Sequence, residues 1–395
     1  MCFSVEGPSQ WCPPRLGSGE RIARDVRRQL RGAKHASIYP NYNCRNDHCG
    51  CGDTHKDIHV AAVALDGLGR RLGTLSVPTS LAGYKELVAW ANGFGPLERA
   101  GVEGTGSFGS GLARFLRAKG IEVFEVIRPK RRDQYRSGKS DPIDAEAAAR
   151  AVLAGTATGR PKGTDGEVEM IRALRAARRS AVKARAQAAN QLKAMLITAP
   201  EGLKSELRAL STAKLVTKVS RFRPGTSPSD VETATKFALR SVARRYQRLS
   251  EEISELDEQL DRLVAEAAPE LLVVEGVGTD TAASLLIAAG DNPERLKNEA
   301  AFAHLCGVAP IPASSGKTVR HRLNRHGDRD ANRALYVIAL CRMSHEERTR
   351  AYVARRTKEG KTKKEIIRCL KRHIAREIYR ILASVSLNKP PNSVS

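Results

Sequence analysis

Residues 59–77 read HVAAVALDGLGRRLGTLSV, and we expect globular structure to begin here. The two apolar runs of this stretch are joined by a glycine-containing turn, which is typical of a β-hairpin. Helical spacing follows in residues 82–94 and 110–120. Short strands are expected at the start of residues 99–109, before the glycine-rich turn that ends this stretch, and in residues 121–127. Because strands alternate with helices, this part of the chain predicts an α/β layer.

Upstream of the hairpin, residues 1–51 mix Pro, Gly, Arg and Cys without helical or strand periodicity, and we expect them to be poorly ordered. The stretch NCRNDHCGCG at residues 43–52 is too polar for a buried strand. Its cysteines and histidines, with those just after it, are zinc-ligand types whose spacing matches no pattern of two ligand pairs. They are Cys44, His48, Cys49, Cys51, His55 and His59.

Downstream, a basic loop at residues 128–140 precedes a helix that starts at about Asp141. Between about residues 167 and 266, long charged helices replace the strands, with a Pro/Gly/Ser break at residues 223–230. A heptad seam in the second helix comprises Val242, Tyr246, Leu249, Ile253, Leu256, Leu260 and Leu263. A weaker stripe in the first helix comprises Ile171, Leu174, Ala181, Ala188, Leu192 and Met195. Either the two helices pair as an antiparallel coiled coil, or the seam serves a dimer.

The charge of the chain indicates a polyanionic partner. Of its 395 residues, 67 are Lys or Arg and 43 are Asp or Glu, which gives a formal net charge of +24. Only 5% of residues are aromatic, so contact with phosphate backbones fits better than base stacking. No apolar run reaches the roughly 18 residues of a membrane helix. We therefore expect a cytoplasmic protein without a membrane partner.

Four carboxylates are candidate metal ligands: Asp53, Glu103, Asp141 and Asp144. Asp53 precedes one strand, Glu103 ends another, and the remaining two open a helix, where their spacing of three places them on one face. Four hard oxygen ligands from separate elements are what a pair of Mg²⁺ ions needs in phosphoryl transfer. The alternative is that Asp141 is only a helix cap and that Asp53 and Glu103 are surface charges.

A second candidate site lies in residues 307–335, GVAPIPASSGKTVRHRLNRHGDRDANRAL. Here Ser314, Ser315 and a glycine precede a run of cations, and a serine beside such cations is suited to attack a phosphodiester. The cations are Lys317, Arg320, Arg322, Arg325, Arg329 and Arg333. The alternative is a Ser-Gly turn next to a DNA-binding helix.

A third candidate is a helix-hairpin-helix in residues 269–290, PELLVVEGVGTDTAASLLIAAG. A tight turn with Gly276 and Gly278 separates two apolar helices, and the backbone N–H groups at the second helix start are suited to hold a phosphate. A plain helical hairpin remains the alternative. No GxxxxGK[ST] loop is present in the sequence, so we expect no nucleotide cofactor.

Taken in order, these segments resemble the DEDD-type transposases of the insertion sequence 110 family. The match runs from about Gly52 to about Ala383, through GDTHKDIHV (52–60), GVEGTGSFG (101–109), GKSDPIDAEAAARA (138–151), EGVGTDTAASLL (275–286), FAHLCGVAPIPASSGKTVRHRLNRHGDRDANRAL (302–335) and KKEIIRCLKRHIAREIYR (363–380). The resemblance implies a ribonuclease-H-like (resolvase-like) domain at residues 52–162, a coiled-coil region at 163–266 and a mostly helical transposase domain at 267–384. Residues 385–395 are then a disordered tail.

The resemblance also implies the chemistry of a transposase. Asp53, Glu103, Asp141 and Asp144 become the metal-binding acids, and Ser315 becomes the nucleophile, with Ser314 as its less favoured neighbour. Family members act as dimers or tetramers on the DNA of element ends and targets, guided by a noncoding bridge RNA, and we expect this chain to associate with a bacterial nucleoid. The alternative is a metal-dependent, structure-specific nuclease, such as a junction resolvase, without serine chemistry.

The chain departs from the family at its N-terminus, because members have an apolar strand leading into the first Asp. Codons allowed for residues 46–51, read one base later, can encode Thr-Ile-Ile-Val-Gly-Val, which is such a strand. We hypothesise that about the first 51 residues come from a shifted reading frame, which sequencing of the DNA tests.

Overall fold

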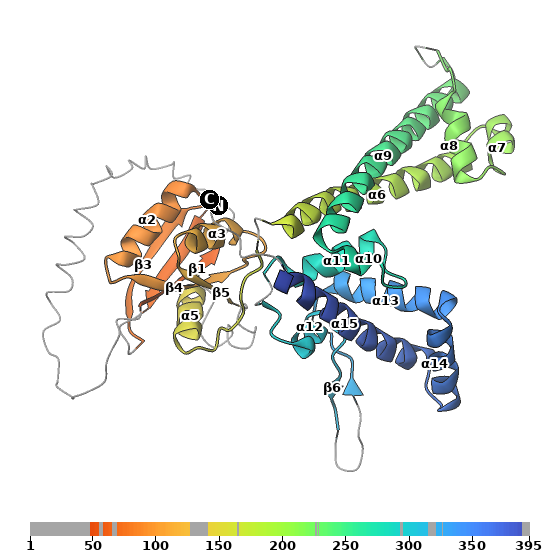
Figure 1. Cartoon of the computed structure of the whole chain (residues 1–395). Helices are drawn as coiled ribbons and strands as arrows, with labels where there is room; N and C mark the ends of the chain where they lie inside the picture. The colour runs from red at the N-terminus through yellow and green to blue at the C-terminus, as the bar shows by residue number, and fades with distance from the viewer. Residues whose placement is uncertain are drawn as a thin grey trace, which may run out of the picture. The chain divides into compact units, whose positions relative to one another are not determined.

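The computed structural model describes residues 48–54, 58–64, 69–126, 141–163, 166–225, 227, 229–292, 295–314, 321–325 and 327–388. The side chains of residues 48–54, 58, 60–64, 141–144 and 385–388 are outside this description. The chain divides after Pro161 into two compact units (Figure 1). The first unit is α/β, and the second is almost entirely helical.

The first unit is built on a five-stranded sheet with the strand order β3-β2-β1-β4-β5. Strand β2 (Ile58–Ala64) pairs antiparallel with both β1 (His48–Thr54) and β3 (Arg71–Pro78). Strand β4 (Leu97–Glu103) pairs parallel with β1 on one side and with β5 (Glu122–Val126) on the other. This arrangement is consistent with the nuclease-like α/β domain that the sequence resemblance implies.

The predicted hairpin of residues 59–77 is confirmed, since β2 and β3 pair antiparallel along their whole length. The prediction that residues 43–52 contribute no strand is wrong for the last part of that stretch, because β1 begins at His48 and lies in the centre of the sheet. Two neighbours explain this outcome. Both β2 and β4 present backbone N–H and C=O groups to the same stretch, and the ladder needs these groups rather than particular side chains.

Helices cover the sheet of the first unit. Helix α2 (Leu81–Asn92) begins at an N-cap formed by Ser80, whose hydroxyl accepts a hydrogen bond from the Gly83 N–H at 3.2 Å. Helices α2 and α3 (Ser110–Ala118) pack on the sheet through a core that includes Val102, Leu112 and Leu116. Helix α5 (Asp141–Leu153) packs against β1, β2 and β4.

In the second unit, two long helices form what we call the arm: α6 (Glu167–Ile197) and α9 (Val231–Ala267), which pack along each other (Figure 1). The short helices α7 (Glu201–Leu207) and α8 (Thr212–Ser220) lie at its far end. Of the predicted seam in α9, Ile253, Leu260 and Leu263 are buried, whereas its other members are half-buried. The residues of α9 that are buried without having been predicted are Leu239, Ala243, Val264 and Ala267.

The rest of the second unit is a helical core that surrounds Phe302, Leu335 and Ile378. Its helices are α10 (Pro269–Leu272), α11 (Thr279–Ala289), α12 (Glu299–Leu305), α13 (Arg329–His345), α14 (Glu347–Lys358) and α15 (Lys363–Asn388). Ile171 of α6 and Leu260 of α9 belong to the same hydrophobic cluster, so the base of the arm and the helical core are one packed body. No helix in the described part of the chain is long and apolar enough to cross a membrane.

Candidate active site

Two of the predicted metal ligands lie side by side at the ends of neighbouring parallel strands. Gly52 of β1 is paired with Val102 of β4, and Asp53 and Glu103 are the next residues along the two strands. Parallel pairing therefore sets Asp53 and Glu103 at the same edge of the sheet. The Glu103 side chain is half-buried there, while that of Asp53 lies outside the described part.

A tight turn after Glu103 explains the glycines of the GVEGTGSFG segment. Gly104 has a φ of 63°, a conformation that favours glycine, and its carbonyl oxygen accepts hydrogen bonds from the N–H groups of Ser107 and Gly109. A Cβ on Gly109 would lie 2.4 Å from the Glu103 carbonyl oxygen. The turn thus brings Gly109 back against the backbone of Glu103, and α3 begins at the next residue.

The other two acids, Asp141 and Asp144, occupy the first turn of α5, which packs on β1 and β4. All four predicted ligands therefore come from three elements that contact one another. Carboxylate oxygens are ligands that hard divalent cations prefer, so this set of donors and its backbone placement fit a divalent metal. The side chains of Asp141 and Asp144, like that of Asp53, are outside the described part.

The second candidate site is a loop that we call the serine loop, residues 308–327. Strands β6 (Ile311–Pro312) and β7 (His321–Arg322) pair antiparallel, so Pro312 and His321 are neighbours across this two-stranded sheet. Ser314 is exposed just beyond β6. Ser315, Lys317 and Arg320, which the sequence analysis singled out, lie outside the described residues.

The residues at the two ends of the serine loop, which we call its foot, are residues 305–307 and 327–328. This foot is held by side chains that sequence reasoning missed. Asn332 of α13 donates from its Nδ2 to the carbonyl oxygens of Cys306 at 2.8 Å and Gly307 at 3.2 Å. The Nζ of Lys371 on α15 donates in turn to the Asn332 Oδ1 at 2.9 Å. Lys371 is only 8% exposed, and its burial, with the charge of Arg368, lowers its pKa. The sequence signal for this role was the position of Lys371, a charged residue among the buried apolar residues of α15.

A glycine and an aspartate complete the foot. Gly327 has a φ of 119° and packs so closely that a Cβ would lie 2.7 Å from the Gly307 nitrogen. The Asp328 N–H donates to the Leu305 carbonyl oxygen at 2.7 Å, and the Asp328 carboxylate caps α13. Burial raises the pKa of the nearby Cys306 thiol to about 12, so this cysteine is a poor nucleophile.

Four of the predicted nucleic-acid-binding arginines are described, and all four are exposed. They are Arg322 on β7, Arg325 after it, and Arg329 and Arg333 on α13. Among the described residues, none of them forms an ion pair. Their charge is thus available to a phosphate backbone.

The turn with Gly276 and Gly278 is docked on α13. Gly276 has a φ of 79°, and a Cβ on it would lie 3.2 Å from the Ile338 carbonyl oxygen. The Arg342 Nε donates to the Glu275 carbonyl oxygen at 2.8 Å, which anchors the turn further. The Gly278 N–H donates to the Thr281 hydroxyl at 3.0 Å. These contacts explain the need for glycine at Gly276 by packing, and binding of a phosphate by the turn stays a prediction.

Comparison with known proteins places the chain in a family. Residues 51–199 match the DEDD-type insertion sequence IS110 model, described as a transposase, and residues 268–354 match the Transposase IS116/IS110/IS902 family. The chain belongs to the IS110 family of transposases. The first match contains all four candidate acids, and the second contains the serine loop. An IS110-family transposase is a DNA-processing enzyme, and its DEDD-type domain indicates dependence on a divalent metal.

Two relatives of this IS110-family chain agree with that assignment. It is 28% identical over 247 residues to the transposase for insertion sequence element IS1328 of Yersinia enterocolitica, an alignment that covers 60% of this chain and 68% of that protein. It is 30% identical over 142 residues to an uncharacterised 43.6 kDa protein of insertion element IS110 in Streptomyces coelicolor. The second alignment covers 35% of this chain and 33% of that relative.

Proposed function

We propose that this transposase cuts and rejoins DNA at the ends of an insertion sequence, with Ser315 as nucleophile and Asp53, Glu103, Asp141 and Asp144 as ligands of Mg²⁺. The observation that carries the proposal is the parallel register of β1 and β4, which sets Asp53 and Glu103 side by side under the helix that begins at Asp141. The donors suit a two-ion site, and a bound Mg²⁺ pair would supply charge stabilisation to the attacking and leaving oxygens.

The proposed reaction is a transesterification at a backbone phosphate. The Ser315 hydroxyl oxygen forms a bond to phosphorus, the bond from phosphorus to the departing strand oxygen breaks, and the serine proton ends on that oxygen. A hydroxyl of the incoming strand then displaces the serine and restores a phosphodiester. Arg322 and Arg325 stabilise the charge that develops on the phosphate. Because the phosphoserine conserves the ester bond, no nucleotide cofactor is needed.

Holding the serine loop in place is the role we propose for Asn332 and Lys371. Their hydrogen bonds reach the carbonyl oxygens at which α12 ends and the loop begins. Both are positioning residues, since they act through the loop backbone.

The proposal extends to partners and organisation. The net charge of +24 favours DNA together with a noncoding bridge RNA. We propose a homo-oligomer, a dimer or tetramer, in which the acid site of one subunit acts with Ser315 of another, and a coiled-coil role for the arm. The corresponding domains are residues 52–162, 163–266 and 267–384, with a helix-hairpin-helix around Gly276 and Gly278.

The test is a search for a covalent protein–DNA adduct. Purified full-length chain is incubated with Mg²⁺, the element's RNA and end-bearing DNA, and a denaturant-resistant adduct is measured on gels. We expect the adduct with the unchanged chain and with Ser314→Ala, and at least a hundredfold loss with Ser315→Ala or Asp144→Asn. Nucleic-acid binding, measured in parallel, should persist in all four proteins.

The competing function is a metal-dependent, junction-resolving nuclease, which the DEDD match alone would also accommodate. Strand cleavage that requires Asp144 but survives Ser315→Ala would establish the nuclease and refute the serine mechanism. Adduct formation that moves to Ser314 would correct the nucleophile only.

A further inference from the structure

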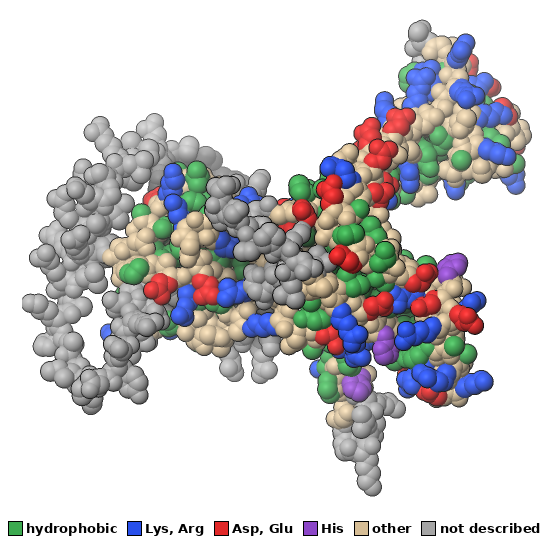
Figure 2. All heavy atoms as spheres, viewed as in Figure 1, with side chains coloured by type: hydrophobic (Ala, Val, Ile, Leu, Met, Phe, Trp, Pro, Cys, Tyr) green, Lys and Arg blue, Asp and Glu red, His purple; other side chains and the backbone are tan. Residues whose placement is uncertain are grey.

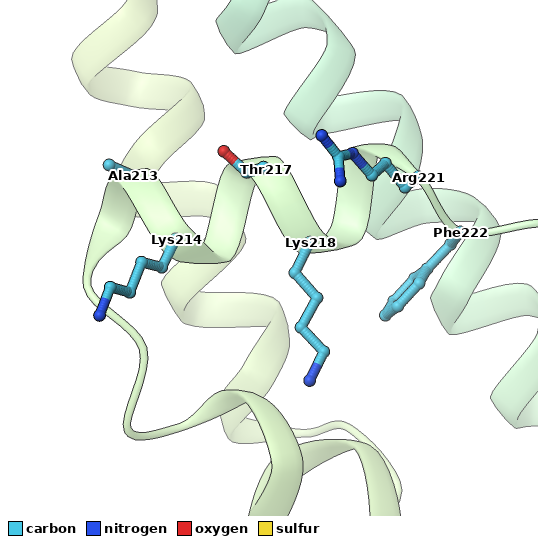
Figure 3. Close-up of a pocket in the computed structure, with 6 residues that line it drawn as sticks. All are labelled: Ala213, Lys214, Thr217, Lys218, Arg221 and Phe222. Atoms are coloured by element: carbon cyan, nitrogen blue, oxygen red, sulfur yellow. The ribbon is translucent and has the colours of Figure 1, made fainter.

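The far end of the arm carries a surface hollow of about 600 Å³. It is lined by one face of α8 and the residues just after that helix: Ala213, Lys214, Thr217, Lys218, Arg221 and Phe222. Figure 3 shows Lys214 and Lys218 extending to the same side of α8 as the ring of Phe222. Three of the six lining residues are therefore cationic, and one is aromatic.

The sequence of α8 explains this face. Lys214, Lys218 and Arg221 recur at spacings of four and three, so they share one side of the helix. Leu215, Val216 and Val219 lie on the opposite side and are buried in the hydrophobic cluster at the tip of the arm. The cations thus span about 10 Å of a helix that its apolar face fixes to the arm.

Charge is distributed unevenly along the arm. Residues 193–245, which form its far part, contain eleven Lys or Arg and four Asp or Glu. Residues 246–267, nearer the helical core, contain two Lys or Arg and seven Asp or Glu. Figure 2 shows Lys and Arg gathered at the far end and Asp and Glu along the middle of the arm. Net positive charge is therefore concentrated around the hollow.

The cations of the hollow differ in their partners. Among the residues that the structure describes, neither Lys214 nor Arg221 forms an ion pair. Lys218 does, since its Nζ lies 2.6 Å from the Glu206 carboxylate. Exposed cations without a carboxylate at hand, on a fixed helix face, are the usual ligands of a nucleic-acid backbone.

From these observations we propose that the hollow binds the phosphodiester backbone of a nucleic acid, with Lys214, Lys218 and Arg221 contacting phosphates. This site is separate from the serine-loop arginines and requires neither metal nor Ser315. It rests on the proposed function only in that the chain acts on nucleic acid. Glu206 competes with phosphate for Lys218 and so limits the affinity.

The experiment compares two double variants of the full-length chain that remove equal charge from the same end of the arm. Lys214→Gln/Lys218→Gln alters the hollow, whereas Lys204→Gln/Lys236→Gln removes lysines that pair with Glu201 and Glu232. Binding to duplex DNA, duplex RNA and single-stranded RNA is measured by fluorescence anisotropy from 0.05 to 1 M salt without Mg²⁺. Far-ultraviolet circular dichroism confirms folding.

For a duplex, each lost phosphate contact lowers the slope of log K against log salt by about 0.9. We therefore expect the hollow variant to lose roughly 30-fold in affinity at 0.15 M salt and almost nothing at 1 M, with a far smaller loss in the control. Equal losses in the two variants would overturn the proposal, because net charge alone would then explain them. The nucleic acid that shows the difference identifies the source of the phosphates.

Two further variants test the same site from other directions. Glu206→Gln releases Lys218, and we expect affinity to rise about threefold, a gain that misfolding does not produce. Unchanged or weaker binding would contradict the assignment of Lys218.

Phe222→Leu keeps the apolar packing but removes the aromatic face, so a loss of affinity restricted to single-stranded RNA would show that bases stack there. Adduct formation by Ser315 is measured in a separate experiment. The proposal for the hollow can therefore fail while the proposal for the serine nucleophile stands, and the reverse also holds.

Discussion

The most exacting residue positions lie at the foot of the serine loop, where backbone comes close to backbone. Gly327 combines a positive φ with contacts to Gly307 that leave no room for a side chain. Glycine was visible in the sequence at this position, but its role was not, because the close approach joins segments twenty residues apart. Asn332 and Lys371 were missed for the same reason.

Gly327→Ala should destabilise the second unit by about 3 kcal/mol or more, since backbone strain adds to the steric clash. Gly360→Ala is the matched control, because Gly360 also has a positive φ, 79°, with open space around it. We expect the control to cost only about 1 kcal/mol. Urea unfolding followed by circular dichroism measures both. Equal costs would show that the close approach to Gly307 carries no energy.

Glu299, the first residue of α12, should give a pH-dependent contribution to stability. Hydrogen bonding by Arg372, helped by Arg376, lowers the pKa of its carboxyl below the ordinary value of 4.5. The folded pKa is thus below the unfolded one, so the stabilisation is complete above about pH 4.5 and is lost as pH falls through the folded value. Glu299→Gln should cost about 1 kcal/mol at pH 7 and progressively less below pH 4.5.

The control for Glu299→Gln is Glu347→Gln, which removes an exposed acid from the first residue of α14, without an ion pair among the described residues. It should show a cost of a few tenths of a kcal/mol from the helix dipole alone. Thermal melts from pH 3 to 8 measure both variants. A cost at Glu299 that stayed constant down to pH 3 would contradict the ionic origin.

Among the elements, those with clear periodicity were predictable and those decided by their neighbours were not. The hairpin of β2 and β3 and the helices of the arm follow from alternation and heptad spacing. The seam of α9 was predicted from its bulky residues, and so Ala243 was overlooked. Ala243 is fully buried in the hydrophobic cluster at the tip of the arm, while Val242 beside it is half-buried.

Strand β1 is the element that sequence reasoning placed least well, and it leads to a test of whether the apolar strand of the shifted frame suits this fold better. Giving residues 46–51 the sequence Thr-Ile-Ile-Val-Gly-Val supplies β-branched residues to a central strand, which suits such a position. We expect the first unit to gain at least about 2 kcal/mol, because each buried aliphatic side chain contributes roughly 1.5–3 kcal/mol.

The control for this replacement changes His48→Asn, Cys49→Ser and Cys51→Ser, which removes three of the five replaced side chains, both cysteines among them, without adding apolar surface. Differential scanning calorimetry of the full-length proteins compares the transitions. A gain in the control as large as in the apolar variant would mean that loss of cysteine, rather than a restored strand, is responsible.

For the whole molecule, the division into two units follows from where the hydrophobic clusters lie. The cluster of the first unit draws on residues between Val77 and Val123, whereas the largest cluster of the second draws on residues between Val168 and Leu382. The described clusters share no residue across Pro161. The sequence indicated the change from α/β to helical structure. It did not indicate that the base of the arm and the helical core share one hydrophobic cluster, which the structure shows.

Residues 162–388 should therefore fold without the first unit. Expressed alone, this fragment should show one cooperative thermal transition and a helical circular dichroism spectrum, since its core residues all lie within it. It should also bind nucleic acid in a salt-dependent way, while Lys214→Gln/Lys218→Gln weakens that binding. A fragment without a cooperative transition would show that the first unit contributes to folding of the second.

Because the arm is long, a small rotation at its base produces a large displacement at its tip. Its helix α6 has 31 residues, so the arm is about 46 Å long, and a rotation of only about 5° at its base carries the tip about 4 Å, the diameter of a phosphate group. The base is fixed where Arg175 pairs with Asp280 at 3.2 Å and with Asp330 at 3.6 Å. These ion pairs add to the hydrophobic packing that joins the base of the arm to the helical core. The position of the hollow therefore depends on contacts at the opposite end of the arm, far from the residues that line the hollow.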